Sequence, residues 1–161
     1  MLPIAIHALP ICRRTLLGWV GASLLVRRRP AEVWAESEAV QQAIRQRIGE
    51  RQPQPGGMAL RLPKIAETGN SVPVTVTVDS PMTPEDYVAR IHLFVPGNPE
   101  PVAATYHLGI RAGKAEISTR IRLARTQMVL ALAEMHDGAV RSDTASIVVT
   151  LGACVEEIWN N

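Results

Sequence analysis

The stretch that decides the fold is VPVTVTVD, residues 72–79. Its four valines alternate with Pro73, Thr75, Thr77 and Asp79, so one face of the segment is apolar and the other is polar. A period of two is typical of a β-strand that lies with one face against a core. Pro73 lacks an N–H donor, which suits the start of a strand or the edge of a sheet.

Similar short stretches follow along the chain, separated by turns rich in Pro, Gly, Asn and Asp. They are YVARIHLFV (87–95), VAATYHL (102–108), AEISTRIRL (115–123), TQMVLALAEM (126–135) and SDTASIVVTL (142–151). The composition of residues 126–135 also favours a helix, but the flanking strands and the HDGAV turn indicate a strand. This spacing predicts an all-β fold, an immunoglobulin-like antiparallel β-sandwich of six or seven strands. Met82, Met128 and Met135 are expected to fill its core.

A different period precedes the strands, in ESEAVQQAIRQRIGE (residues 36–50). Val40, Ala43, Ile44 and Ile48 fall on one face of a helix, and Gly49 can end it. The segment predicts a short N-terminal amphipathic helix that packs on the domain or on a partner. RQPQPGG follows as a linker, so we expect residues 36–57 to hold helix and linker, 58–151 the sandwich and 152–161 a C-terminal arm.

The first 35 residues have the pattern of a targeting segment. Arg13-Arg14 precedes an apolar run of about a dozen residues, too short to span a bilayer comfortably. The pattern predicts a twin-arginine-type signal peptide, cleaved after Ala35, and therefore a periplasmic protein. An uncleaved N-terminal anchor is the alternative.

Charge excludes one class of partner. Without residues 1–35, the chain has 12 basic against 14 acidic residues, so most of the basic excess belongs to the leader. No basic stripe remains for nucleic acid.

Enzyme motifs are scarce in this sequence. There is no phosphate-binding loop, HExxH or GxSxG pattern, and His92, His107 and His136 are never at metal-ligand spacing, so we expect them to be surface or strand residues. Glu85 and Asp86 follow a proline and are expected to be turn residues. No catalytic residue, metal or cofactor is predicted.

Cys154 is the only cysteine beyond the leader, and it lies three residues past the last predicted strand. Tails of this kind are usually exposed, so the thiol would extend roughly 10 Å from the strand end at ~3.3–3.6 Å per residue. The residue pattern leaves three interpretations open: a reactive or carrier thiol, an intermolecular disulfide, and an inert buried side chain. The broader alternative to a carrier is a non-catalytic binding or assembly module.

Two long strings carry a family resemblance. LPKIAETGNSVPVTVTVDSPMTPEDYVARIHLFVPGNPEPVAATYHL (62–108) and AEISTRIRLARTQMVLALAEMHDG (115–138) closely resemble the SoxY family of periplasmic thiosulfate oxidation. The resemblance implies an immunoglobulin-like fold, a heterodimer with a SoxZ-like protein, and sulfur held covalently on a cysteine near the C-terminus. It also implies a c-type cytochrome and a hydrolase that act on the bound sulfur, while the carrier itself is no enzyme and needs no other cofactor.

The arm departs from the Gly-Gly-Cys-Gly-Gly end of the family. Gly152 and Cys154 match it, but Ala153, Val155 and Glu156 replace glycines, and EIWNN follows Glu156. GACVE resembles the Ala-Ala-Cys-Ile-Glu arm of a SoxY-related paralogous group, to which we assign the chain. The neighbouring Glu156 and Glu157 are expected to raise the pKa of the Cys154 thiol, because like charge disfavours the thiolate.

Overall fold

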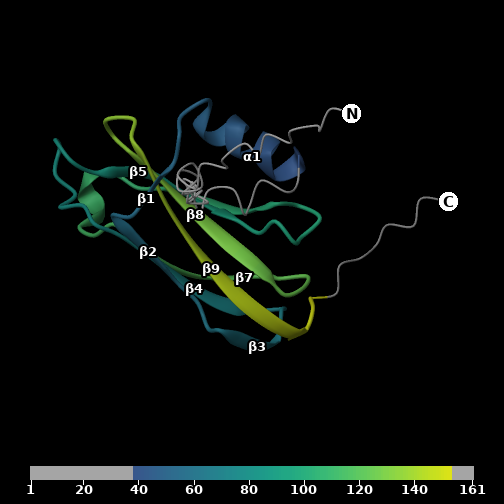
Figure 1. Cartoon of the computed structure of the whole chain (residues 1–161). Helices are drawn as coiled ribbons and strands as arrows, with labels where there is room; N and C mark the ends of the chain where they lie inside the picture. Colours follow the sequence, from purple (N-terminus) through teal and green to yellow (C-terminus); the bar gives the residue numbers. More distant parts are fainter. Residues whose placement is uncertain (1–37, 154–161) are drawn as a thin grey trace, which may run out of the picture. The chain divides into compact units, whose positions relative to one another are not determined.

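The computed structural model describes residues 38–153, in which one α-helix lies against the larger of two β-sheets and a short 3-10 helix (Ile110–Ala112) follows β6 (Figure 1). The larger sheet has the strand order β1-β9-β8-β5-β6, with β3 also paired to β9, and the smaller sheet has the order β2-β4-β7. The elements are α1 (Glu38–Ile48), β1 (Gln54–Pro55), β2 (Met58–Arg61), β3 (Ile65–Thr68), β4 (Val72–Val78), β5 (Val88–Phe94), β6 (Val102–His107), β7 (Glu116–Ile121), β8 (Gln127–Met135) and β9 (Val140–Leu151).

The core between the sheets is built as the alternation predicts. All four valines of β4 are buried, while the alternate residues of that strand are exposed or half-buried. They pack with Ile91 and Leu93 of β5 and Val129 of β8 in one apolar cluster. An all-β sandwich is therefore confirmed, and the polar face of β4 carries Thr75, whose Oγ1 lies 3.1 Å from Ser118 Oγ on β7.

Strand β8 is buried on both faces, which explains its helix-like composition. Every residue from 129 to 134 is buried. Val129 and alanines 131 and 133 face the smaller sheet, whereas Leu130 and Leu132 pack with Phe94 of β5 against helix α1. A strand covered on both faces needs a continuous apolar run rather than an alternating one.

Helix α1 covers this second face of the larger sheet. Its buried residues are Val40, Ala43, Ile44 and Ile48, the face that the sequence predicts. Gly49 ends it with φ of 65°, a conformation that favours glycine, and its N–H donates to the Arg45 carbonyl at 2.8 Å. The helix therefore packs on the domain itself.

The strand pairing corrects two expectations. The sandwich is not wholly antiparallel, because β1 and β3 both pair with β9 in parallel. Residues 51–57 are more than a linker, since Gln54 and Pro55 pair with Arg141 and Ser142 of β9. The structure has nine strands rather than the predicted six or seven. The additional strands have only two or four residues, which is too short for an alternating pattern to be recognised in the sequence.

No helix among residues 38–153 is long and apolar enough to cross a membrane.

Candidate functional site

The described chain ends at the root of the predicted cysteine arm. β9 finishes at Leu151, and Gly152 and Ala153 follow it. Cys154, Val155 and Glu156, the other predicted arm residues, lie outside the described residues. The structure therefore defines what holds the arm, rather than the arm's thiol.

Backbone hydrogen bonds hold this root on both sides. The Gly69 N–H, in the turn between β3 and β4, donates to the Leu151 carbonyl at 2.7 Å. The Ala153 N–H donates to the Leu123 carbonyl at 2.9 Å, and the Leu123 N–H donates to the Gly69 carbonyl at 2.8 Å. Gly69, Leu123 and the arm root thus form a closed set of backbone contacts, which we call the arm clamp.

Two glycines of this region are required by close approach. A Cβ on Gly152 would lie 2.1 Å from the Ala124 carbonyl oxygen, and one on Gly69 would lie 1.9 Å from the Leu123 carbonyl oxygen. Contacts this short force the backbone to move. Gly152 therefore packs the arm root against the loop before β8, a role distinct from the flexibility usually given to glycine.

The clamp also corrects where the arm starts. The arm is expected to begin at Gly152, directly after the sandwich, but Ala153 is only 9% exposed. Its N–H is paired, so it is still part of the folded domain. Cys154 is the next residue along the chain, which places its backbone about 3.8 Å from the Cα of a fixed residue.

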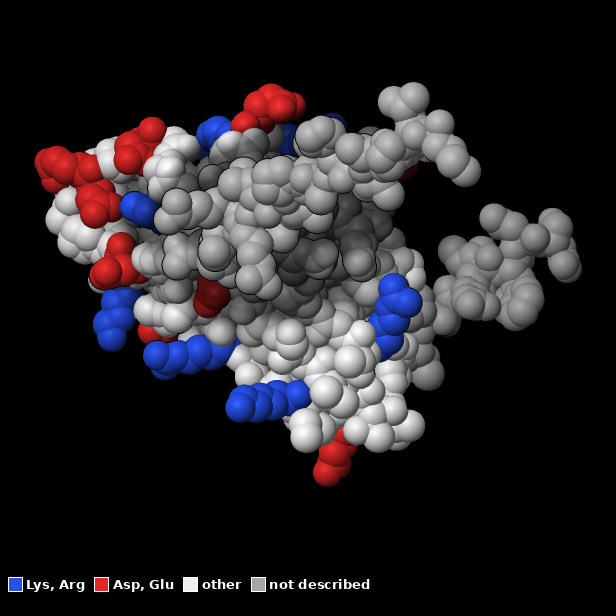
Figure 2. Space-filling view, viewed as in Figure 1, with Lys and Arg blue, Asp and Glu red and all other residues white. Residues whose placement is uncertain are grey.

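An apolar surface adjoins the arm root. Ile65 of β3 pairs with Val148 of β9, and these side chains are 66% and 51% exposed, while Leu151 is 68% exposed. Figure 2 shows largely uncharged surface where β3 and the end of β9 lie. Exposed apolar groups that gather beside a candidate site indicate contact with another protein. We call Ile65, Val148 and Leu151 the β3–β9 patch.

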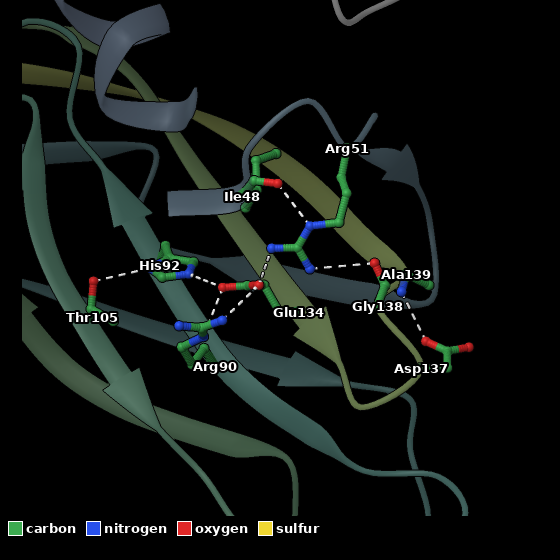
Figure 3. Close-up of polar contacts among 9 residues, drawn as sticks. All are labelled: Ile48, Arg51, Arg90, His92, Thr105, Glu134, Asp137, Gly138 and Ala139. Carbon is green, nitrogen blue, oxygen red and sulfur yellow. Dashed lines mark hydrogen bonds and ion pairs between the residues drawn. The ribbon is translucent and has the colours of Figure 1, made fainter. Parts of the chain in front are cut away.

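A buried polar cluster lies under the C-terminal end of α1 (Figure 3). His92 of β5 and Glu134 of β8 are each 1% exposed, and the two side chains share one face of the sheet. His92 Nε2 donates to Glu134 Oε1 at 2.7 Å, and its Nδ1 lies 3.0 Å from Thr105 Oγ1. Arg90 Nε is 2.9 Å from Glu134 Oε1, and Arg90 Nη2 donates to Glu134 Oε2 at 3.1 Å.

Arg51 connects this cluster to the helix. Its Nη2 donates to Glu134 Oε2, its Nε donates to the Ile48 carbonyl at 2.7 Å, and its Nη1 to the Gly138 carbonyl at 3.4 Å. Glu134 therefore accepts three hydrogen bonds and has one further ion-pair contact with Arg90 Nε, and these occupy both carboxylate oxygens. This arrangement joins the end of α1 to the β8–β9 turn.

The environment shifts the pKa of both buried groups downward. Burial lowers the pKa of His92, and this outweighs the raising effect of Glu134 beside it. Burial alone would raise the pKa of Glu134, but the hydrogen bonds from His92 and Arg51, with the charges of Arg51 and Arg90, bring it below its ordinary value. The cluster is thus a neutral imidazole beside a carboxylate.

This cluster has the properties of a structural support. Neither the hollow along α1 nor the groove between β6 and β7 is lined by His92 or Glu134. The sequence predicts that His92 is a surface or strand residue; it lies in strand β5, but its burial beside Glu134 was not predicted. The alternation of the strands could have indicated this burial. His92 and Glu134 lie on the same face of the sheet as Phe94, Leu130 and Leu132, and α1 covers that face.

The remaining predicted residues lie apart from one another. His107 is exposed, and His136 stacks on Tyr87 with ring centroids 5.1 Å apart. Asp86 belongs to a turn, where its N–H donates to the Thr83 carbonyl at 3.1 Å. Among residues 38–153, no group of three or more His, Cys, Asp or Glu side chains is placed to hold a metal ion.

Comparison with solved structures defines the class of fold. The chain matches the sulfur carrier protein SoxY from Chlorobium limicola f thiosulfatophilum with a TM-score of 0.59 and 28% identity, over 70% of this chain and 97% of that one. It also matches superoxide reductase (neelaredoxin) from Ignicoccus hospitalis, with a TM-score of 0.52 and 13% identity over 58% and 80% of the two chains. The second likeness is one of fold alone. The class is a two-sheet β-sandwich shared by these proteins.

The family follows from the sequence match. The model of the family described as "Sulfur oxidation protein SoxY" matches residues 44–154, which is most of the chain. The chain belongs to the SoxY family. No curated protein matches it.

Proposed function

We propose that this protein is a sulfur carrier, which holds sulfur intermediates covalently on Cys154 while partner enzymes of sulfur oxidation act on them. The observation that carries the proposal is the family match, which extends to residue 154. The arm clamp supports it, because it holds the chain rigidly as far as Ala153 and leaves Cys154 as the next residue. Gly152, Ala153, Val155 and Glu156 are the arm around the thiol.

The chemistry needs little from the carrier itself. A cysteine reacts as the thiolate, and bonding its sulfur to an incoming sulfur species releases two electrons and the thiol proton. We propose that a c-type cytochrome of the system accepts the electrons and that a hydrolase cleaves the oxidised sulfur from the arm. The carrier is then a substrate of both enzymes and catalyses neither step, and its only bound group is the sulfur on Cys154.

A SoxZ-like protein is the proposed partner in a heterodimer. The β3–β9 patch supports such a partner, because it places exposed apolar side chains beside the arm root. A protein seated there would lie next to the thiol without covering the core of the sandwich. Export by the twin-arginine-type leader to the periplasm, with cleavage after Ala35, completes the proposal.

The arm assigns the chain to the paralogues with an Ala-Ala-Cys-Ile-Glu type of sequence. Val155 is β-branched and stiff, and Glu156 is charged, whereas the arm of a standard carrier is glycine on both sides of the cysteine. Partner enzymes that act on this arm must therefore have wider entrances than a glycine arm requires.

The test is a strain in which Cys154→Ser replaces the native chain. We expect the serine variant to be exported and to co-purify with its partner as the native chain does, while sulfur-dependent growth is lost. Cys12→Ser, in the leader, is the matched control and should leave growth intact. Normal growth of the Cys154→Ser strain would favour the alternative, a non-catalytic binding module whose cysteine is structural.

A further inference from the structure

A groove opens between the edges of the two sheets. β6 is the last strand of the larger sheet and β7 is the last strand of the smaller one. Residues of both strands and of the β5–β6 loop line a hollow with a volume of about 390 Å³ between them, which we call the β6–β7 groove. A volume of this size is in the range that holds a ligand or a large side chain.

The groove has apolar side chains at its base and polar and basic side chains around its rim. Ile121 is buried and Tyr106 is half-buried, whereas Arg120 and Arg122 are exposed on β7 and just beyond it. Arg120 Nε donates to Ser71 Oγ at 2.8 Å, which leaves its other donors available. The Arg122 guanidinium has no hydrogen-bond or ion-pair partner within residues 38–153. Glu100 is the one acidic residue of the lining.

The C-terminal tail has the complementary composition. Residues 155–161 read VEEIWNN, so two acidic residues precede an isoleucine and a tryptophan. A basic rim suits the acidic pair, and an apolar interior suits Ile158 and Trp159, whose exposure to water is unfavourable. The order of residues in the tail thus matches the two parts of the groove.

The tail starts close enough to reach it. The Ala153 N–H is bonded to the Leu123 carbonyl, and Leu123 is the residue after Arg122. The Arg122 carbonyl and the Ala124 N–H point away from the arm root, to Asn98 at the end of the groove, with both bonds at 2.9 Å. The tail therefore has to pass one extended segment of backbone, residues 122–124, a width of about 4.8 Å, while the three residues to Glu156 span up to roughly 10 Å.

We propose that the C-terminal tail docks in the β6–β7 groove of its own chain, with Glu156 and Glu157 paired to Arg120 and Arg122 and Trp159 in the apolar interior. Docking draws Cys154 against the loop that follows β7 and restrains it, and release of the tail frees the thiol. The proposal goes beyond the carrier function and does not depend on it, because docking needs no sulfur on Cys154.

Tryptophan fluorescence tests this directly. In a chain with Trp19→Phe and Trp34→Phe, Trp159 is the only indole, and its accessibility to the neutral quencher acrylamide can be measured. We expect protection at low salt that falls at about 1 M salt, where charges are screened beyond about 3 Å. Arg120→Gln/Arg122→Gln should raise the quenching constant about twofold or more, as expected for losing two partly exposed ion pairs. Arg141→Gln, away from the groove, is the control and should change nothing.

Charge reversal separates docking from a general effect on folding. Arg120→Glu/Arg122→Glu should release Trp159, and adding Glu156→Arg/Glu157→Arg in the same chain should restore its protection. Protection that vanishes on dilution would place the tail in a second copy and overturn the proposal. Quenching as fast as that of free tryptophan at low salt, or protection that ignores both arginines, would also overturn it.

Discussion

At the scale of single residues, Glu134 is the group on which most polar contacts converge. It takes hydrogen bonds from Arg51, Arg90 and His92 while it is 1% exposed. A buried carboxylate with this many donors is fully paired, and removing one partner leaves the others uncompensated. The cluster therefore stabilises the contact between α1 and the larger sheet.

The two pKa shifts make this contact sensitive to acid. The pKa of His92 is lowered in the folded chain. As the pH falls below about 6.5, the unfolded chain therefore binds a proton before the folded chain does, and this favours unfolding. The pKa of Glu134 is also lowered in the folded chain, so the free energy of unfolding falls further below about pH 4.3. We expect the free energy of unfolding, measured with urea, to fall between pH 7 and pH 5, and His92→Gln to flatten that fall. Equal slopes in both proteins would contradict this account of His92.

His92 also shows what the sequence could not settle. The alternation predicts which face of β5 it occupies, but burial of that face depends on α1, which is about 50 residues away in the chain. A histidine in a strand is compatible with either an exposed or a covered face. Its pairing with Glu134 could be proposed only once the register of β5 and β8 was known, which places Arg90 opposite Glu134.

At the scale of elements, the helix and the six longer strands could be predicted because each contains several turns of its period. The face of α1 and the turn at Gly138 are confirmed, the latter with φ of 88°. β1 and β3 could not be predicted, because β1 has two residues and β3 four, and their parallel pairing with β9 is a long-range contact. The arm clamp could not be predicted for the same reason, because it joins residues 69, 123 and 153, which are far apart in the sequence.

The arm clamp makes a specific prediction about Gly152. Gly152→Ala places a methyl group against the Ala124 carbonyl, so we expect a loss of about 1–3 kcal/mol in the free energy of unfolding. Amide hydrogen exchange should accelerate at Gly69, Leu123 and Ala153, the donors of the clamp.

Gly109→Ala is the matched control for this substitution. A Cβ at Gly109 meets no atom within 4 Å, and its φ of −142° suits any residue. This variant should be neutral or slightly stabilised, by up to about 1 kcal/mol. If the two variants have the same free energy of unfolding and hydrogen exchange at the three amides is unchanged, close packing is not the reason that a glycine is present at position 152.

At the scale of the whole molecule, the parts divide into a rigid sandwich and a short arm. The larger sheet is covered by α1 on one face and by the smaller sheet on the other. Under the proposed function, the chemistry takes place at the end of the chain, where the clamp fixes Ala153 and Cys154 follows. Sequence reasoning could name the cysteine and its family, but the clamp, the β3–β9 patch and the β6–β7 groove depend on strand order.

The most direct test of the carrier proposal is the intact mass of the protein, purified from periplasm of cells oxidising a reduced sulfur compound. We expect species heavier than the free chain by bound sulfur or sulfur oxyanions, lost on treatment with reductant and absent from Cys154→Ser. The same spectrum also reports whether the chain begins after Ala35. A free thiol on Cys154 in every preparation from sulfur-oxidising cells would contradict the proposal that this residue carries sulfur.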